Sequence, residues 1–117
     1  MDFRKLIVWQ KAMDMTVHLY AVIDSLPAKE IYALSSQMRR AAVSIPSNIA
    51  EGAGRASSND KKHFFAIARG SSSELQTQLL ICGRLGYLDD TCVKALCNEA
   101  LEIQKILSSL IDKDTLR

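Results

Sequence analysis

The sequence predicts an all-α protein: an antiparallel four-helix bundle with up-down-up-down topology. Four segments place apolar residues at alternating steps of three and four, the period of a helix, and no segment alternates with the period of a strand. The joining stretches are short, about three to six residues, which makes consecutive helices antiparallel neighbours. We expect one domain spanning residues 1–117, with helices over about 5–25, 29–53, 58–85 and 89–112.

The first helix carries one apolar stripe, which we expect to face the core. The stripe follows steps of three and four through Leu6, Trp9, Met13, Thr16, Tyr20 and Ile23. Pro27 ends the helix because proline cannot continue it and disfavours the helical conformation of Leu26.

The second helix contains a proline inside its periodic segment. Its predicted core residues are Ile31, Leu34, Met38, Ala41, Ile45 and Ile49, and Gly52 and Gly54 mark its end. Pro46 removes one backbone donor, which costs about 3 kcal/mol in a helix interior. Because the stripe continues through this position, we expect a single helix kinked at Pro46, with Ser44 and Ser47 near enough to satisfy the freed backbone groups.

The third and fourth helices have recognisable ends. Ser57 is the predicted N-cap of the third helix, Gly86 suits the left-handed residue that closes it, and Asp89 caps the fourth. The predicted core line of the third helix is Phe64, Ala68, Ser71, Leu75, Leu79 and Cys82. That of the fourth is Val93, Leu96, Ala100, Ile103, Leu107 and Leu110.

The chain holds more apolar residues than one core can face. Three successive helical residues, 79–81, sweep about 200°, and residues 6–9 raise the same difficulty, whereas one core-facing stripe covers somewhat more than 100°. We therefore expect a homo-oligomer; an unusually apolar monomer is the alternative. Ala66, Gly70 and Ser73 are predicted to let the third helix pack closely against another helix.

Composition and motifs exclude several classes. A chain of 117 residues with five glycines and two prolines is not of low complexity, and its longest charge-free stretch, residues 41–50, is too short to span a membrane. Three cysteines (Cys82, Cys92 and Cys97) form no CxxC pair, and His18 and His63 stand alone. We expect no metal site, no cofactor, no catalytic residues and reduced thiols in a cytoplasmic protein.

Positive charge is concentrated in the middle of the chain. Residues 39–69 contain six cations and two acids, although the whole chain has a net charge of only +2. A surface of this kind can face phosphates, whereas a solvated face with ordinary scatter of charge is the alternative. The candidate nucleic-acid-binding residues are Arg39, Arg40, Arg55, Lys61, Lys62 and Arg69.

Polar residues also share one side of the second helix. This polar stripe, which spans about 100° of a helical wheel, comprises Arg40, Ser44, Ser47, Asn48, Glu51 and Arg55. Glu51 and Arg55 have the favourable spacing for an ion pair within a helix. The stripe can be an ordinary wet face, a polar subunit contact or an anion site, and the sequence leaves these three open.

Several blocks resemble a known family. The segment RRAAVSIPSNIAEGAGR at residues 39–55, with FRKLIVWQKA before it and IARGSSSEL and LGYL after it, is similar to the four-helix-bundle proteins named for the intervening sequence in bacterial 23S ribosomal RNA genes. The resemblance implies a cytoplasmic bacterial protein without enzymatic activity. Members are similar to the accessory protein of diversity-generating retroelements, which implies a barrel-like homopentamer that binds nucleic acid.

Two functional hypotheses follow. The first is a non-enzymatic homo-oligomer that contacts RNA or DNA through backbone phosphates. The second is a protein-interaction or scaffold module with no nucleic-acid role, in which the polar stripe is a subunit or partner contact. Neither needs a small-molecule substrate or a membrane, and no histidine in the sequence has an evident nucleophile partner.

Overall fold

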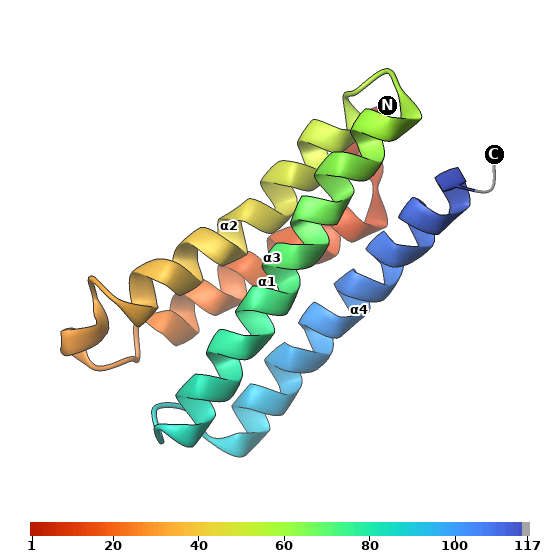
Figure 1. The fold of residues 1–117 in the computed structure, drawn as a ribbon. Helices are drawn as coiled ribbons and strands as arrows, with labels where there is room; N and C mark the ends of the chain where they lie inside the picture. Colours follow the sequence, from red (N-terminus) through yellow and green to blue (C-terminus); the bar gives the residue numbers. More distant parts are fainter. Residues whose placement is uncertain (116–117) are drawn as a thin grey trace.

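The computed structural model describes residues 1–115, with side chains to residue 113, and these form four long helices (Figure 1). No strand occurs in that part of the chain, so the predicted all-helical class is confirmed. Two short 3-10 helices precede α1 and α2. In chain order the elements are η1 (Phe3–Lys5), α1 (Ile7–Ile23), η2 (Ala28–Glu30), α2 (Leu34–Ala53), α3 (Ser58–Arg84) and α4 (Asp90–Thr115).

The four helices lie side by side in a body of 46 × 22 × 20 Å. Contacts between the helices give their order: α1 meets α2 and α4, and α3 meets α2 and α4. Between α2 and α3, for example, Met38 contacts Cys82 and Ser44 contacts Ser71, so residue numbers fall in one helix as they rise in the other. The N-terminus lies at the end where α2 passes into α3 (Figure 1).

The core-facing side of α1 differs from the prediction. Met13 and Tyr20 are exposed, and the buried residues are Val8, Ala12, Met15, Leu19 and Ile23. The buried line has the same helical period as the predicted one and lies roughly 100° away from it, since it is shifted by one residue. Both lines are apolar, and the small Ala12 allows α1 to approach the core closely.

α2 begins at Leu34, five residues later than expected. After Pro27 the chain makes the 3-10 helix η2, and Ala33 has the non-helical angles φ −122° and ψ −105°. Ile31 and Tyr32 are 50% and 96% exposed, so no burial of apolar surface stabilises a longer helix there. The prediction that Ile31 belongs to the core is therefore wrong.

α2 runs without interruption through Pro46, as one helix. Because proline has no N–H, the carbonyl of Ala42 lacks the donor that the fourth residue along normally supplies. The Thr16 hydroxyl of α1 lies 3.2 Å from this carbonyl oxygen. The freed group is therefore served by a neighbouring helix and not by the predicted serines: Ser44 bonds to α3, and Ser47 is exposed.

α3 packs closely on α2 through a glycine of α2. A Cβ placed on Gly52 would lie 2.8 Å from the Phe65 ring and 3.2 Å from Cβ of Phe64. Gly70, by contrast, is exposed, a Cβ added there would meet no atom within 4 Å, and its neighbours Ala66 and Ser73 are exposed too. Within one chain these exposed residues do not form the predicted close contact, and close packing against a helix of a second copy stays a prediction.

The predicted start and end of α3 and the predicted start of α4 are confirmed, whereas α4 extends to Thr115. The Ser57 hydroxyl accepts a hydrogen bond from the N–H of Asp60 at 3.1 Å, and Asp89 accepts one from the N–H of Cys92 at 2.8 Å. Gly86 has φ +76°, the left-handed conformation that closes a helix. Within α3, Phe65 and Ser72 are buried where Phe64 and Ser71 were expected.

Candidate nucleic-acid interface

The six candidate cations do not form one patch. Arg39 and Arg40 lie in the first half of α2, whereas Arg55, Lys61 and Lys62 surround the turn between α2 and α3. Sixteen residues separate Arg39 from Arg55, or roughly 24 Å at about 1.5 Å per helical residue. The length of α2 therefore holds these two groups of cations apart, by about half of the 46 Å length of the molecule.

Arg39 and Arg40 have different surroundings. The guanidinium of Arg39 pairs with the Asp24 carboxylate at 3.0 Å and lies over the Tyr20 ring, 5.7 Å from its centre. Arg40 forms no ion pair among the described side chains; its one polar contact there is with the Ser36 hydroxyl at 3.5 Å. Arg40 is therefore the more available of the two for an external anion.

The second group of cations surrounds the α2–α3 turn. Arg55 pairs with Glu51 at 3.1 Å, which confirms the predicted spacing, and its guanidinium lies 4.6 Å from the centre of the Phe64 ring. Lys61 Nζ donates to the backbone carbonyl of Ala53 at 3.1 Å, where the positive charge favours the C-terminal end of α2. Lys62 has no ion pair in the part of the chain with described side chains.

Arg69 lies on another side of the molecule. Its guanidinium donates to the Ser108 hydroxyl of α4 at 3.2 Å, so it faces the α3–α4 seam. The nearby amide of Gln104 reaches Gln76 and the buried Ser72 hydroxyl, which itself donates to a carbonyl of α4. Arg69 thus lies along the same α3–α4 seam as this polar network, and the structure does not bring it to the other candidates.

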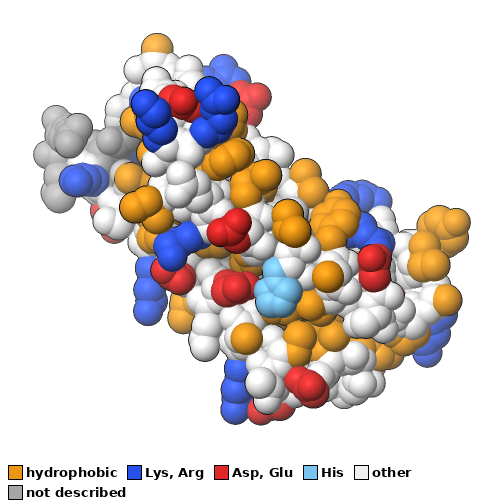
Figure 2. Space-filling view, turned by 180° about the vertical axis from the view of Figure 1, so that it is seen from behind, with side chains coloured by type: hydrophobic (Ala, Val, Ile, Leu, Met, Phe, Trp, Pro, Cys, Tyr) orange, Lys and Arg blue, Asp and Glu red, His pale blue; other side chains and the backbone are white. Residues whose placement is uncertain are grey.

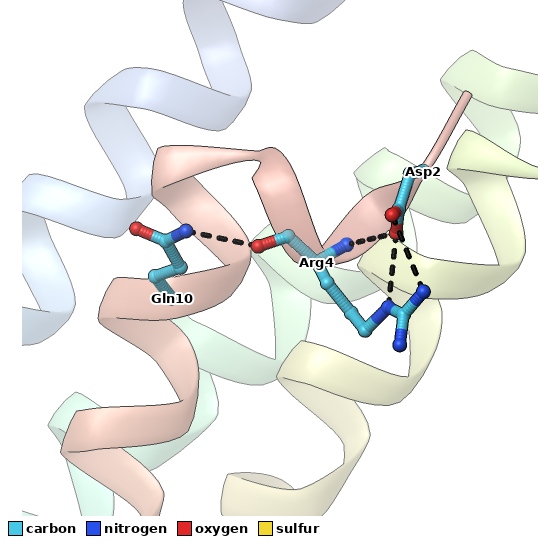
Figure 3. A network of polar contacts seen from close by, with 3 residues as sticks. All are labelled: Asp2, Arg4 and Gln10. Atoms are coloured by element: carbon cyan, nitrogen blue, oxygen red, sulfur yellow. Dashed lines mark hydrogen bonds and ion pairs between the residues drawn. The ribbon is translucent and has the colours of Figure 1, made fainter.

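The N-terminal segment adds cations that the sequence analysis missed. The Asp2 carboxylate accepts hydrogen bonds from the N–H and guanidinium of Arg4, and Gln10 donates to the Arg4 carbonyl at 2.9 Å (Figure 3). Hydrogen bonds from Arg4 lower the pKa of Asp2 below its ordinary value. The arrangement holds η1, and hence Arg4 and Lys5, at the end of the molecule where Arg55 lies. These residues could have been noticed as cations just ahead of the first helix.

The polar stripe is partly internal. Ser44 Oγ lies 2.8 Å from Ser71 Oγ of α3, and the Asn48 amide donates to the Ser44 carbonyl at 2.8 Å. Ser44 therefore joins α2 to α3, and Asn48 holds Ser44 from within α2. Ser47, Glu51 and Arg55 instead line a hollow of about 370 Å³, which Phe3, Ala50 and Gly54 complete.

The thiols and histidines form no metal site in the described part of the chain, where no group of three potential ligands occurs. Burial raises the pKa of Cys82 to about 11, and burial likewise raises the pKa values of Cys92 and Cys97. A hydrogen bond to Glu30 at 2.7 Å raises the pKa of Tyr87. The three thiols are free and are poor nucleophiles near neutral pH.

The fold and the surface together define a small all-helical protein with cations and apolar side chains exposed on its surface. None of its described helices is long and apolar enough to cross a membrane. The chain belongs to the 23S rRNA-intervening sequence protein family, which it matches over residues 4–109. The resemblance carried by residues 39–55 is thereby confirmed.

A solved structure shares the fold. The crystal structure of a protein of unknown function from the S23 ribosomal protein family of Bacteroides thetaiotaomicron matches with a TM-score of 0.84 and 25% sequence identity. The match covers 90% of this chain and 98% of that one. No curated protein matches the chain.

Proposed function

We propose that this chain is a non-enzymatic, self-associating helical protein that contacts RNA or DNA through backbone phosphates. Phosphate contacts need accessible cations and no reading of base edges. Repetition of each cation in an oligomer multiplies the small charge of one chain, and phosphate binding depends on such a summed field.

The observation that carries the proposal is the availability of four candidate cations. Arg40, Lys61, Lys62 and Arg69 form no ion pair with any described carboxylate, whereas Arg39 and Arg55 each have one. A cation without a carboxylate partner can meet a phosphate without first breaking an ion pair. The turn between α2 and α3, where Lys61 and Lys62 lie beside Arg55, is the best supported contact region.

Binding measured against salt concentration tests the proposal. The wild-type chain is titrated with duplex DNA and with ribosomal RNA at several salt concentrations. The Lys61→Gln/Lys62→Gln variant is compared with Lys94→Gln/Lys105→Gln on α4. Each lost phosphate contact on duplex DNA reduces the slope of log affinity against log salt by about 0.9, so the first variant should lose about 1.8 for each copy that contacts the duplex. The control should keep the wild-type slope.

Two results would reject phosphate binding. One is no measurable affinity at a low salt concentration, and the other is an affinity that does not change with salt. Circular dichroism of both variants establishes that the helices are intact, since Lys61 also contacts the end of α2.

The alternative is a protein-interaction or scaffold module without nucleic acid. Exposed apolar residues favour this candidate, because Val17 is 70% and Tyr20 40% exposed on α1. Charge reversal at Arg39 and Arg40 separates the two functions. Loss of assembly without any change in nucleic-acid binding would favour the interaction module.

We further propose that the helices form one antiparallel up-down-up-down domain with α2 bent at Pro46. The residue pairs between neighbouring helices support the topology, and the missing donor at Pro46 supports the bend. The expected number of copies, five, comes from the family resemblance alone, whereas the proposed cytoplasmic location is supported by both the resemblance and the free thiols.

A further inference from the structure

A polar groove lies on the surface between α2 and α3. Its volume is about 560 Å³, and the side chains that line it are Gln37 and Arg40 of α2 and Glu74, Thr77, Gln78 and Ile81 of α3. All of them except the isoleucine carry hydrogen-bonding groups, and two have opposite charges. The groove therefore offers a cation, a carboxylate and two amides to a single ligand.

The two charges of the groove have no ion-pair partner in the part of the chain with described side chains. Arg40 has one polar contact there, with the Ser36 hydroxyl at 3.5 Å, and Glu74 is exposed. The seam between α1 and α4 differs, because Lys11 pairs with Glu102 across it at 2.8 Å. In the rear view of Figure 2, side chains of opposite charge likewise adjoin each other. Only the groove leaves a cation and a carboxylate together for an external partner.

Arg40 and Glu74 point toward opposite ends of the groove. Helical side chains lean toward the N-terminus of their own helix, and residue numbers fall in α3 as they rise in α2, so the two side chains lean apart. The contact between Met38 and Cys82 places Ser36, which Arg40 reaches, beside the later part of α3. Glu74 lies eight residues before Cys82, or roughly 12 Å at about 1.5 Å per residue. A ligand that joins both charges is therefore elongated.

A buried glutamine adds an observation that is independent of the charges. Gln78 follows Glu74 by one helical turn, so its side chain leans back toward that carboxylate. The residue is 94% buried, and its Oε1 has no hydrogen-bond partner among the described residues. Buried amides normally have partners, and a half-turn of this amide presents either its oxygen or its N–H to the groove. The groove thus holds an amide that lacks a partner within the chain.

We propose that this groove binds a guanine nucleotide whose base is unpaired. One edge of guanine carries the N1–H and N2–H₂ donors beside the O6 acceptor. The Glu74 carboxylate accepts from both donors, and the neighbouring Gln78 amide donates to O6. At the other end of the groove the Arg40 guanidinium binds the phosphate. Ile81, which is 42% exposed, provides apolar surface for the sugar.

The chemistry of the groove favours guanine over other ligands. In an α-amino acid one carbon separates the ammonium from the carboxylate, which is too short to join Arg40 to Glu74. Adenine and cytosine place an acceptor beside their single amino group, and that acceptor would face the carboxylate. Uracil has one N–H between two acceptors. In a duplex the N1 and N2 edge of guanine is already paired, so the ligand is a free nucleotide or an unpaired residue of a strand.

Calorimetric titration tests the base preference. The wild-type chain is titrated at low salt with GMP, AMP, CMP and UMP. It is also titrated with a short single-stranded RNA of uridines that contains one guanosine, and with the same strand without it. A well-formed bidentate contact to a base discriminates by about 10-fold or more. We expect that preference for GMP over the other nucleotides, for the strand with guanosine, or for both.

Two substitutions divide the contacts between base and phosphate. Glu74→Gln replaces one of the two acceptors by a donor, so it should abolish the preference for guanine. Arg40→Gln should weaken the binding of all four nucleotides and leave the base preference intact. Glu102→Gln on α4 is the matched control, because it removes a carboxylate of the opposite seam, and it should behave as the wild type. Circular dichroism verifies that each variant is folded.

The outcomes are distinct from those of the proposed function. No binding, or equal affinity for ligands with and without guanine, overturns the inference. A guanine preference that survives Glu74→Gln, or that Glu102→Gln removes equally, overturns it too. A preference for GMP supports a free nucleotide as the ligand, and a preference seen with the strand alone supports an unpaired residue of RNA. The phosphate contacts of Lys61 and Lys62 are measured separately on duplex DNA, which offers no unpaired guanine edge, so either proposal can fail without the other.

Discussion

The contact between Thr16 and the proline-containing stretch of α2 makes a testable link between two helices. Thr16→Val keeps the shape of the side chain and removes the hydroxyl that lies 3.2 Å from the Ala42 carbonyl. Pro46 provides no N–H to this carbonyl. We expect Thr16→Val to lower the free energy of unfolding by about 1 kcal/mol, the usual net value of one hydrogen bond, or roughly 4 °C in Tm for a domain of this size.

A double-mutant cycle isolates the proposed cause. Pro46→Ala restores the backbone donor, so Thr16→Val should cost markedly less in that background than in the wild type, with a coupling of about 1 kcal/mol. Urea unfolding followed by circular dichroism, at one fixed protein concentration because association shifts apparent stability, measures all four chains. Thr77→Val is the matched control, since the exposed Thr77 hydroxyl contacts only the Ser73 carbonyl of its own helix, at 3.1 Å.

The same double-mutant cycle can also contradict the proposed role of the Thr16 hydroxyl. If Thr16→Val costs the same with proline or alanine at residue 46, the hydroxyl does not compensate for the missing donor. The hydroxyl also lies 2.7 Å from the Ala12 carbonyl of its own helix. If Thr16→Val lowers the free energy of unfolding equally in both backgrounds, the contribution of the hydroxyl comes from this local bond, which has no relation to Pro46.

Three further changes test the packing and the thiols. Gly52→Ala should lower unfolding free energy by about 1–3 kcal/mol because its Cβ would lie 2.8 Å from Phe65, and an unchanged urea midpoint would contradict this. Ser72→Ala should cost about 1 kcal/mol, since the buried hydroxyl donates to the Ala100 carbonyl at 2.9 Å; the same urea titration measures it. Cys82, with a pKa of about 11, should react with iodoacetamide at pH 8 at least about 100-fold more slowly in the folded chain than in urea, as mass spectrometry can follow. Equal alkylation rates in the folded chain and in urea would refute the burial of Cys82. Because folding raises the pKa of this thiol from 9.0, its contribution to the free energy of unfolding is present below pH 9 and is lost as pH rises towards 11.

Helical period predicts the four helices well and the buried face of α1 poorly. On α2 the predicted core residues Met38, Ala41, Ile45 and Ile49 are buried, because the opposite face of that helix is polar. On α1 the sequence is apolar on more than one side, so two lines with the same period compete. Only packing against α2 and α4 selects the line that includes Ala12, and a single-helix pattern contains no information on that choice.

In the candidate site, too, the sequence predicts contacts within one helix but not contacts between helices. The sequence predicts the cations and the Glu51–Arg55 pair, because that pair lies within one helix turn. It does not predict that Arg69 reaches Ser108, since a contact across 39 residues depends on how α3 and α4 face each other. The separation of Arg39 from Arg55, roughly 24 Å, follows from the length of α2. The candidate cations are therefore close together in the sequence but not in space.

The segment at residues 39–55, which carries the family resemblance, is mainly occupied with building the fold. Ile45 and Ile49 fill the core, Gly52 admits the Phe65 ring, and Asn48 braces Ser44 against α3. These structural roles account for the segment without any ligand. The segment is therefore evidence for the shape of α2 and is not, by itself, evidence for a binding partner. Evidence for function has to come from residues that make few contacts within the chain. On α2 that residue is Arg40, which has no ion pair among the described side chains and lines two separate hollows of the surface.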